Sequence, residues 1–504
     1  MNEDTKNTTA TDFDLVVIGG GINGAGIARD ATGRGLSVML CEKDDIAEHT
    51  SSSSTKLIHG GLRYLEHYDF MLVRHALQER EVLLSMAPHI IWPLRFILPH
   101  HKSLRPRWMI RLGLFLYDHI GGRKILPKSN SVDLSKHVAG EVLKDTFDHG
   151  FEYSDCWVQD ARLVVLNLID AHERGCDVRI RTEVTDLTRL DDHWNIKMID
   201  HVTGEHSSVT AKLIVNASGP WVDKTLDLDS EHDSRYSTRL VKGSHIVVPK
   251  LHDHPYTYIF QHTDNRVLFA IPYEKDYTLL GTTDMEIEGD PGAVTIDQEE
   301  TDYICSAVSE YFNTTIKPES VVWSYAGVRP LYDDASSNAS KVTRDYKLDL
   351  DVRKNVPVLS VYGGKITTYR KLADQAVDML SDHLPVEKSD WTATTPLPGG
   401  DMPNADFDAY TDQKIKQFSW LDEKLVRVYT RDYGTRIDKL LAECTKPEDL
   451  GQHFGGNLYQ REVDYLVNSE WARSSDDILW RRTKKGLTLS GENIKALDQY
   501  LESL

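Results

Sequence analysis

The feature that most limits the possible folds is a glycine-rich turn near the start of the chain, Gly19-x-Gly21-x-x-Gly24. The apolar run 15–18 before it suits a buried strand, and the small residues after it have helical spacing. The first glycine permits the turn, the second leaves room for a pyrophosphate, and the third lets helix and strand pack closely. The helix N-terminus then faces the anion. This pattern predicts an α/β fold that binds a dinucleotide.

A second apolar segment, "LSVMLCE", supports this interpretation. It ends on Glu42, about 20 residues after the first glycine, where a carboxylate meets a ribose hydroxyl in such folds. An isolated glycine motif would be weak evidence, and a purely structural turn remains the alternative. NAD and FAD share this first half-site, so the turn does not decide between them.

Length and composition limit the number of domains and the class of protein. A chain of 504 residues should divide into two or three domains. No stretch approaches the roughly 18 apolar residues that cross a bilayer, and residues 1–13 are expected to form a disordered lead-in without the features of a signal peptide. These observations favour a cytoplasmic protein. A net charge of −20 disfavours nonspecific binding to nucleic acid.

The cysteines argue against a disulfide framework and against a structural metal site. There are five of them, widely scattered and never in C-x-x-C spacing. We therefore expect reduced, mostly buried thiols and no bound metal.

Longer segments spread along the chain share motifs with one enzyme family. They are "TSSSSTKLIHGGLRYLE" (50–66), "FEYSDCWVQDARL" (151–163), "NASGPWV" (216–222), "KGSHIVVP" (242–249), "GTTDMEIEGDP" (281–291), "YAGVRPL" (325–331), "TRDY" (343–346), "GGKITTYRKLA" (363–373) and "EWARSSDDILWRRTK" (470–484). From about Asp14 into its C-terminal region, the chain resembles the FAD-dependent glycerol-3-phosphate dehydrogenases. Other D-amino-acid-oxidase-like flavoproteins share only the glycine-rich start, the "NASGPW" type of strand end and a late Gly-Gly turn.

The resemblance implies an FAD-dependent oxidoreductase region over residues 14–395. Its Rossmann-like FAD-binding domain would be discontinuous, built from 14–70, 150–225 and 320–380. Residues 230–320 alternate apolar and polar positions between turns, which is typical of an antiparallel sheet, here expected to form most of the substrate domain. After "PLPGG" the composition becomes charged with helical spacing, so we place a helical C-terminal domain at 396–504, with a role in homodimer contact or capping.

The same motifs supply candidate cofactor contacts. The serine-rich loop around 50–61 offers hydroxyl and backbone donors that suit a pyrophosphate or a flavin edge, although serine runs also form linkers. The segment "LSVYGGKITTYRKLADQAVDML" repeats the pattern of strand, Gly-Gly and helix, and by resemblance it approaches the N1 and O2 side of the flavin. The cofactor candidates are Gly19, Gly21, Gly24, Glu42, Ser51, Ser52, Lys56, Gly61, Ala217, Gly219, Gly327, Gly364, Lys365 and Ile366.

The resemblance makes glycerol 3-phosphate the expected substrate. Three cations, Arg329, Arg344 and Lys365, are candidates to hold its phosphate, because arginine forks and lysine ammonium groups suit a dianion. Arg63 and Thr367 are expected as supporting polar contacts. Arginines in large proteins more often form surface ion pairs, and only the apolar surroundings of Arg329 argue against that alternative.

Oxidation of the secondary alcohol to dihydroxyacetone phosphate requires hydride transfer from C2 to flavin N5 and a general base. His245 and His59 are the candidates, since imidazole titrates near neutral pH. Arg329 is a catalytic alternative, because it could stabilise developing alkoxide charge. The sequence does not decide between the two histidines, and His245 is preferred only slightly.

The segment 100–124 mixes six basic residues and one acidic residue with apolar and aromatic side chains. Such a surface would rest on an anionic membrane, although a core helix with a charged end fits equally well. Bacterial members of the resembled family are peripheral enzymes on the inner face of the cell membrane that deliver electrons to quinone. The alternatives that stay open are an oxygen-reducing glycerol-3-phosphate oxidase, an amino-acid oxidase of the same superfamily, and a flavin-binding protein without turnover.

Overall fold

The first strand, turn and helix form where the glycine pattern predicts them. In the computed structural model, β1 (Phe13–Ile18) leads through the turn into α1 (Ile22–Gly33), and β2 (Val38–Glu42) ends on the predicted carboxylate. The structure describes residues 11–62, 65, 69–102, 104–232, 236–262, 264, 266–332, 346–387 and 389–504. Most of the expected lead-in, residues 1–10, therefore lies outside the described residues.

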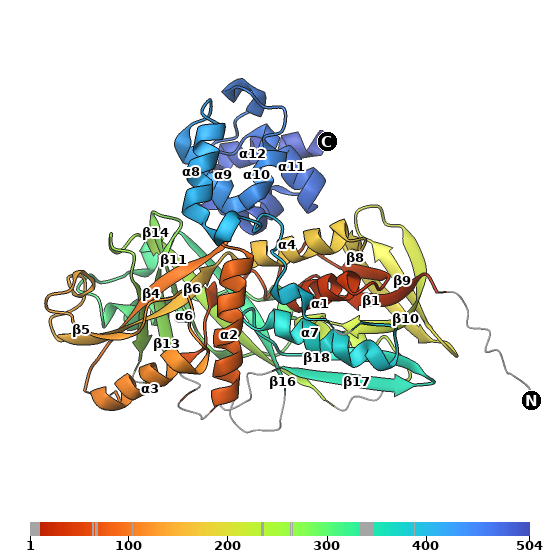
Figure 1. The fold of residues 1–504 in the computed structure, drawn as a ribbon, viewed down its shortest axis with the longest axis horizontal. Helices are drawn as coiled ribbons and strands as arrows, with labels where there is room; N and C mark the ends of the chain where they lie inside the picture. Colours follow the sequence, from red (N-terminus) through yellow and green to blue (C-terminus); the bar gives the residue numbers. More distant parts are fainter. Residues whose placement is uncertain are drawn as a thin grey trace, which may run out of the picture. The chain divides into compact units, whose positions relative to one another are not determined.

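The chain divides into two compact units, each assembled from three separate segments. Figure 1 labels many of their helices and strands. Unit 1 consists of Met1–Ser51, Leu163–Arg239 and Pro330–Thr395. Unit 2 consists of Ser52–Arg162, Leu240–Arg329 and Pro396–Leu504.

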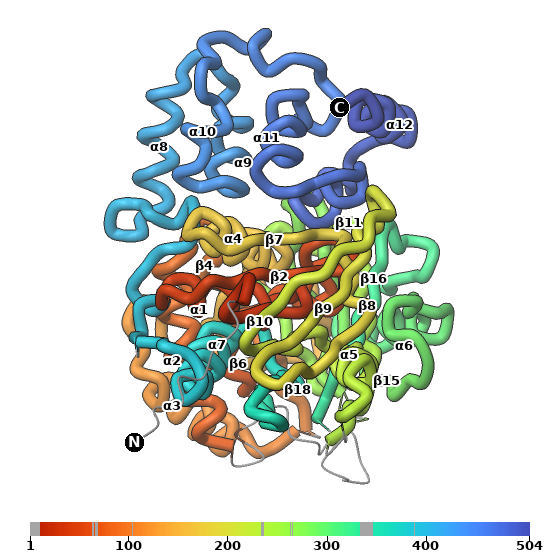
Figure 2. The backbone as a smooth tube through the Cα atoms, turned by 90° about the vertical axis from the view of Figure 1, so that its right-hand side faces the viewer, coloured from red at the N-terminus to blue at the C-terminus, as the bar shows by residue number. Residues whose placement is uncertain are grey.

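Unit 1 is built on an eight-stranded sheet with a parallel centre formed by β2, β1, β10 and β18. Its spatial order is β17 (Lys347–Arg353), β18 (Val356–Tyr362), β10 (His206–Asn216), β1, β2 and β7 (Asp177–Ile180). The strands β9 (Trp194–Asp200) and β8 (Thr182–Arg189) continue antiparallel from β10, and Figure 2 shows these three strands side by side. Its helices are α1, most of α4 (Asp160–Glu173), α5 (Val222–Leu226) and α7 (Tyr369–Met379). The central strands are buried, as expected where helices cover a parallel sheet.

Unit 2 contains a ten-stranded sheet. Its order is β15 (Met285–Glu286), β11 (Thr238–Pro249), β14 (Tyr277–Gly281), β13 (Val267–Tyr273), β12 (Thr257–Gln261), β4 (Ile91–Pro99), β6 (His149–Val158) and β3 (Leu57–Ile58), with β16 (Trp323–Tyr332) beside β11 and β5 (Asn130–Asp133) beside β6. The helices α2 (Phe70–Met86), α3 (Arg107–Ile120) and α6 (Gln298–Ser309) belong to the same unit.

This sheet extends beyond the antiparallel sheet that the sequence predicts over 230–320. The antiparallel pairing of β11 to β14 is confirmed. However, β4 and β6 come from earlier in the chain, and β4 pairs with β12 in parallel. Pairing between distant segments leaves no local pattern in the sequence, which is why the alternation around 230–320 did not reveal these neighbours.

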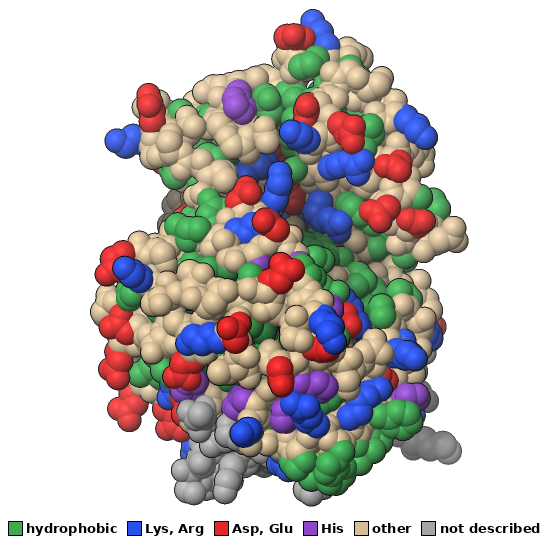
Figure 3. Space-filling model, turned by 90° about the vertical axis from the view of Figure 1, so that its left-hand side faces the viewer, with side chains coloured by type: hydrophobic (Ala, Val, Ile, Leu, Met, Phe, Trp, Pro, Cys, Tyr) green, Lys and Arg blue, Asp and Glu red, His purple; other side chains and the backbone are tan. Residues whose placement is uncertain are grey.

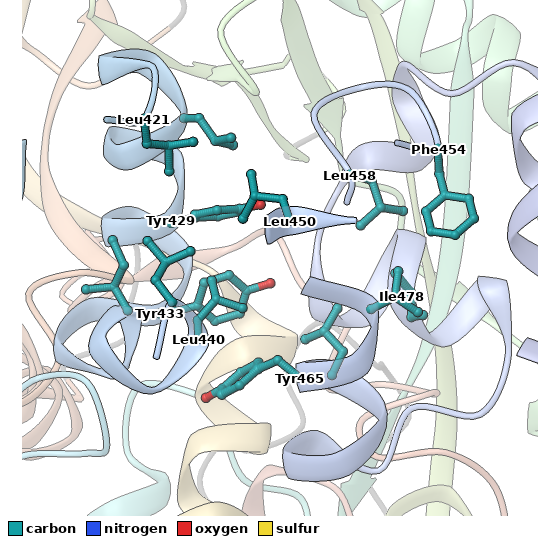
Figure 4. Close-up of a cluster of buried hydrophobic side chains, with 14 of the residues drawn as sticks. Leu421, Tyr429, Tyr433, Leu440, Leu450, Phe454, Leu458, Tyr465 and Ile478 are labelled. Atoms are coloured by element: carbon teal, nitrogen blue, oxygen red, sulfur yellow. The ribbon is translucent and has the colours of Figure 1, made fainter. Parts of the chain in front are cut away.

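The C-terminal part of unit 2 is helical, as predicted. Its elements are α8 (Phe407–Gln417), α9 (Glu423–Tyr433), α10 (Ile437–Leu440), α11 (Gln460–Glu470), a π-helical segment (Asp477–Arg482) and α12 (Gly491–Glu502). Figure 4 shows the buried side chains between these helices, among them Tyr429, Tyr433 and Leu450. All five cysteines, which lie within the described residues, are free thiols, and four of them are buried. Within the described ranges, none of the helices combines the length and apolar character needed to cross a bilayer.

Candidate functional site

The glycine-rich turn of unit 1 is packed so closely that it excludes side chains. Gly19 has a φ of +112°, which only glycine adopts readily. A Cβ atom on Gly24 would lie 1.9 Å from the carbonyl oxygen of Gly19, and one on Gly20 would lie 2.8 Å from Cβ of Glu42. The glycines are therefore required by the contact of helix, turn and second strand.

The first turn of α1 fits an anionic, hydroxyl-bearing ligand. Gly21 is its N-cap and brings no side chain, while the N–H of Ile22 donates to Ser51 Oγ at 2.9 Å. Nδ2 of Asn23 donates to the Gly363 carbonyl, but its Oδ1 is buried without a hydrogen-bond partner among the described residues. An orphaned acceptor beside a helix N-terminus is a place where a bound molecule would complete the hydrogen bonding.

Glu42 is held by backbone groups at the end of β2. Its Oε2 accepts from the Gly20 N–H at 2.6 Å, and its Oε1 accepts from the Asp44 N–H at 2.9 Å. Burial raises the pKa of this carboxyl above its usual range. Each oxygen keeps a second lone pair, so the carboxylate can still accept from a ribose hydroxyl.

Three strand ends of unit 1 converge at this turn. A Cβ on Gly19 would lie 2.5 Å from the carbonyl oxygen of Ala217, after β10. Gly364, after β18, has a φ of +96°, and a Cβ there would lie 2.8 Å from Nδ2 of Asn23. The neighbouring candidates at these strand ends are Gly219, Lys365, Ile366 and Thr367, of which Thr367 is buried. This edge is where open α/β sheets bind nucleotides.

His245 lies at the centre of a separate cluster in unit 2. It projects from β11 and is 1% exposed. Its Nε2 lies 3.0 Å from Thr55 Oγ1, and its ring stacks on the Tyr325 ring with centroids 4.9 Å apart. Burial and the positive charges of Arg329 and Lys56 hold the pKa of His245 well below its usual range. The imidazole is therefore neutral at pH 7, with a lone pair that can take a proton, and the lowered pKa makes it a weaker base than a free histidine.

Arg329 projects from β16 and is held by groups of the same unit. It forms an ion pair with Asp284, and its Nη2 donates to Thr282 Oγ1 at 3.3 Å. A Cβ on Gly243 would lie 2.5 Å from this Nη2, so the glycine makes room for the guanidinium. Its side chain is 31% exposed, so it is accessible, and within the described part of the chain it is paired with Asp284.

Lys56 is fully buried. Its Nζ donates at 2.8 Å to both carboxylate oxygens of Asp160 and at 2.9 Å to the Ser52 carbonyl, and it lies 4.9 Å from the Tyr325 ring centroid. The ammonium group thus has a full set of partners inside the protein. In the same loop, His59 is half-buried beside Gly60, whose N–H donates to Tyr117 Oη at 2.8 Å.

The remaining candidates lie in the same unit or outside the described residues. Gly61 has a φ of +72°, and a Cβ on Gly327 would lie 2.5 Å from Cβ of Ser53. Arg63 and Arg344 fall among the residues that the structure does not describe.

Comparison with known proteins matches both parts of the chain. A family model described as FAD dependent oxidoreductase matches residues 14–350, and one described as the C-terminal domain of alpha-glycerophosphate oxidase matches 391–504. The glycerol-3-phosphate dehydrogenase of Pseudomonas aeruginosa is 51% identical over 97% of this chain and 95% of that protein. The D-erythritol 1-phosphate dehydrogenase of Brucella abortus is 49% identical, over 97% and 98%. The structure of the Bacillus halodurans glycerol-3-phosphate dehydrogenase complexed with FAD covers 97% of this chain and 94% of that chain, with 26% identity and a TM-score of 0.76.

The chain belongs to the family of FAD-dependent glycerol-3-phosphate dehydrogenases. The resemblance inferred from the sequence motifs is thereby confirmed, and FAD is the cofactor. The orphaned acceptor of Asn23 and the N-cap Gly21, which has no side chain, agree with a dinucleotide of this kind.

Sequence reasoning overlooked several groups that surround His245. Thr55 lies in the serine-rich loop and Tyr325 within "YAGVRPL", and neither pattern singles these residues out. The partners of the two cations, Asp160 and Asp284, lie far from them in the sequence. For Tyr325, period-two spacing from Arg329 on one strand was an available signal, since residues at i and i+4 of a strand share a face.

Proposed function

We propose that this protein oxidises glycerol 3-phosphate to dihydroxyacetone phosphate. The observation that carries the proposal is the buried imidazole of His245 in the same cluster as the guanidinium of Arg329. A base of this kind accepts the hydroxyl proton of an alcohol, and a nearby cation stabilises alkoxide or phosphate charge. Bound FAD supplies the acceptor for the hydride that leaves C2, at flavin N5.

In this proposal His245 takes the proton at Nε2, the atom that lies beside the Thr55 hydroxyl. Arg329 binds negative charge on the substrate, and Lys365, Thr367, Arg63 and Arg344 are assigned as further substrate contacts. His59 is the alternative base. The glycine-rich turn and the two other strand ends of unit 1 would hold the cofactor. Ser52, Gly61 and Gly327 stay assigned as cofactor contacts from the sequence motifs, whereas the ammonium group of Lys56 is already used by Asp160 and the Ser52 carbonyl.

The proposal is tested by mixing the purified holoprotein with glycerol 3-phosphate in the absence of air. Bleaching of the flavin absorbance supports it, and a flavin that stays oxidised contradicts it. D-Erythritol 1-phosphate forms a second arm, because the Brucella relative carries that name. Faster bleaching by D-erythritol 1-phosphate would reassign the substrate. Bleaching by amino acids alone would indicate an amino-acid oxidase.

We further propose that the protein rests on an anionic membrane through α3 and passes electrons to a membrane quinone. Trp108, Leu112 and Phe115 share one face of this helix and are 66%, 51% and 50% exposed. Ile125 and Met71 are also exposed. Figure 3 views the molecule from the left-hand side of Figure 1. It shows a hydrophobic patch at the lower edge of that face, with basic side chains above it. Apolar side chains rimmed by cations suit the interface of an anionic bilayer.

Flotation with vesicles tests the membrane proposal. Vesicles with anionic phosphatidylglycerol should carry the holoprotein upward, whereas pure phosphatidylcholine vesicles should carry less. Replacing Trp108 and Phe115 by Ser should abolish flotation, while Val202→Ser, at an equally exposed apolar residue of unit 1, should not. Reoxidation of the bleached flavin by a quinone analogue rather than by oxygen supports the quinone assignment, and the reverse preference indicates an oxidase.

A further inference from the structure

Four aromatic rings form a continuous series of contacts that ends on His245: two stacked pairs joined by a tilted one. Trp480 stacks on Trp323 with ring centroids 4.3 Å apart and an interplanar angle of 15°. Trp323 contacts Tyr325 at 5.0 Å, and Tyr325 stacks on His245 at 4.9 Å and 17°. The separations at Tyr325 lie within the range of about 4.5–7 Å in which aromatic pairs attract each other, and the two tryptophans are slightly closer. We call these four residues the ring ladder.

The ladder links the C-terminal helices of unit 2 to its sheet. Trp323 and Tyr325 lie two positions apart on β16, so they share one face of the strand. Trp480 lies in the π-helical segment Asp477–Arg482, a form of helix that often marks functional positions. A Cβ on Gly486 would lie 2.5 Å from the Trp480 ring, so the chain packs tightly behind it.

Hydrogen bonds alone leave the His245 ring incompletely fixed. Its Nε2 has the Thr55 hydroxyl, but its Nδ1 is buried without a hydrogen-bond partner among the described residues. Catalytic bases are commonly oriented by a second hydrogen bond at the other ring nitrogen. Here one face of the imidazole is covered by Tyr325, and Gly281 comes close to the ring, where a Cβ would lie 2.3 Å from Cδ2.

We infer that Tyr325, Trp323 and Trp480 are positioning residues that fix the His245 ring, so that the C-terminal helices complete the active site. The inference rests on the proposed function, in which His245 accepts the substrate proton. The C-terminal helices thus have a role within the protomer that is separate from dimer contact.

The kinetic test compares variants of the holoenzyme with glycerol 3-phosphate as substrate. Trp480→Leu and Trp323→Leu should lower kcat roughly threefold to tenfold. The free energy of one aromatic pair corresponds to a factor of this size in the share of molecules whose His245 ring is correctly oriented. KM should change less than twofold. Trp480→Phe, which keeps a ring, should restore most of kcat. The matched control is Trp420→Leu, since Trp420 packs against the core of the same helices outside the ladder.

The pH profile separates positioning from general stability. Among the described residues, the charged groups that act on His245 are Arg329 from β16 and Lys56 from the loop before β3, paired with Asp284 and Asp160. Lys484, whose Nζ donates to the Trp480 carbonyl, faces Lys56 and Asp160, and burial lowers its pKa to about 7. These pairs stay in place in the Leu variants. Water reaching the loosened imidazole should move the acid limb of kcat/KM to higher pH in Trp480→Leu, and not in Trp420→Leu.

A second readout does not depend on turnover. Diethyl pyrocarbonate modifies accessible neutral imidazole, and peptide mapping reports modification at His245 alone. His245 should react several-fold faster in Trp480→Leu and Trp323→Leu than in the wild type, Trp480→Phe and Trp420→Leu. Equal reactivity in all five proteins, or equal kinetic losses in Trp480→Leu and Trp420→Leu, overturns the inference. Absence of bleaching in the wild type would instead contradict the proposed function, and the modification rates would still decide on the ladder.

Discussion

The glycine-rich turn of unit 1 and the His245 cluster of unit 2 are built on opposite principles. The turn depends on the absence of side chains, since a Cβ on Gly24 would meet the Gly19 carbonyl oxygen at 1.9 Å. The cluster depends on buried side chains that carry charge, such as Lys56 with Asp160, and on a buried neutral imidazole. Removing a charge should therefore damage the cluster, whereas adding a single methyl group should damage the turn.

The largest effect is expected from Arg329→Ala. Losing a cation that binds substrate charge should lower kcat/KM by about 10²–10⁴, because hydrogen bonds to charged groups are strong and the ion pair with Asp284 is broken. Steady-state kinetics with glycerol 3-phosphate measure it. Arg95→Ala is the control, since Arg95 forms an ion pair with Glu152 in the same sheet. Kinetics as good as those of the Arg95 variant would contradict the role of Arg329.

Breaking the Lys56 ion pair should have a free-energy effect of nearly the same size, but on folding stability instead of kcat/KM. Asp160→Asn leaves a buried ammonium group without its countercharge, which costs about 3–5 kcal/mol of stability. Replacing both residues, as in Lys56→Met with Asp160→Leu, should recover part of that loss, because no isolated charge remains. Thermal unfolding of the three proteins measures the difference. A double variant less stable than Asp160→Asn would show that shape, and not charge, dominates this site.

The difference between the two regions also explains what the sequence could predict. The turn is local: strand, glycines, helix and Glu42 lie within about 30 residues of one another, so their spacing carries the information. The His245 cluster combines Thr55, Asp160 and Tyr325, which become neighbours only when distant strands pair. The motif around His245 indicated a site there, but it did not reveal the ring ladder or the partners of Lys56 and Arg329.

A matched pair of glycines tests the turn. Gly24 and Gly113 both lie inside helices, α1 and α3, so alanine improves helix propensity at both by roughly 0.5–1 kcal/mol. Around Gly113 nothing lies within 4 Å of a new Cβ. Gly113→Ala should therefore be neutral or stabilising, whereas Gly24→Ala should destabilise by about 1–3 kcal/mol through overpacking and should lower the FAD content. Unchanged flavin content in Gly24→Ala would refute the steric argument.

The smallest effect concerns pH and has opposite signs in the two regions. Burial lowers the pKa of His245 well below 6.5, so below pH 6.5 the unfolded chain binds a proton that the folded chain does not. The stabilisation is complete above pH 6.5 and is lost as the pH falls, by at most about 1.4 kcal/mol per pH unit. His245→Asn lacks this dependence. As the pH falls from 7 to 5, its unfolding temperature should therefore rise relative to that of the wild type.

Glu42 should behave in the reverse way. Its pKa is raised by burial, so the folded chain holds the proton more readily, and stability is lost as the pH rises above 4.5. The unfolding temperature of Glu42→Gln should therefore rise relative to that of the wild type as the pH rises from 4.5. Thermal unfolding of the wild type and both variants across this range measures the two slopes. If the two differences from the wild type changed with pH in the same direction, burial would not set both pKa values. The contrast between the buried acid at the turn and the buried base in the cluster would then be wrong.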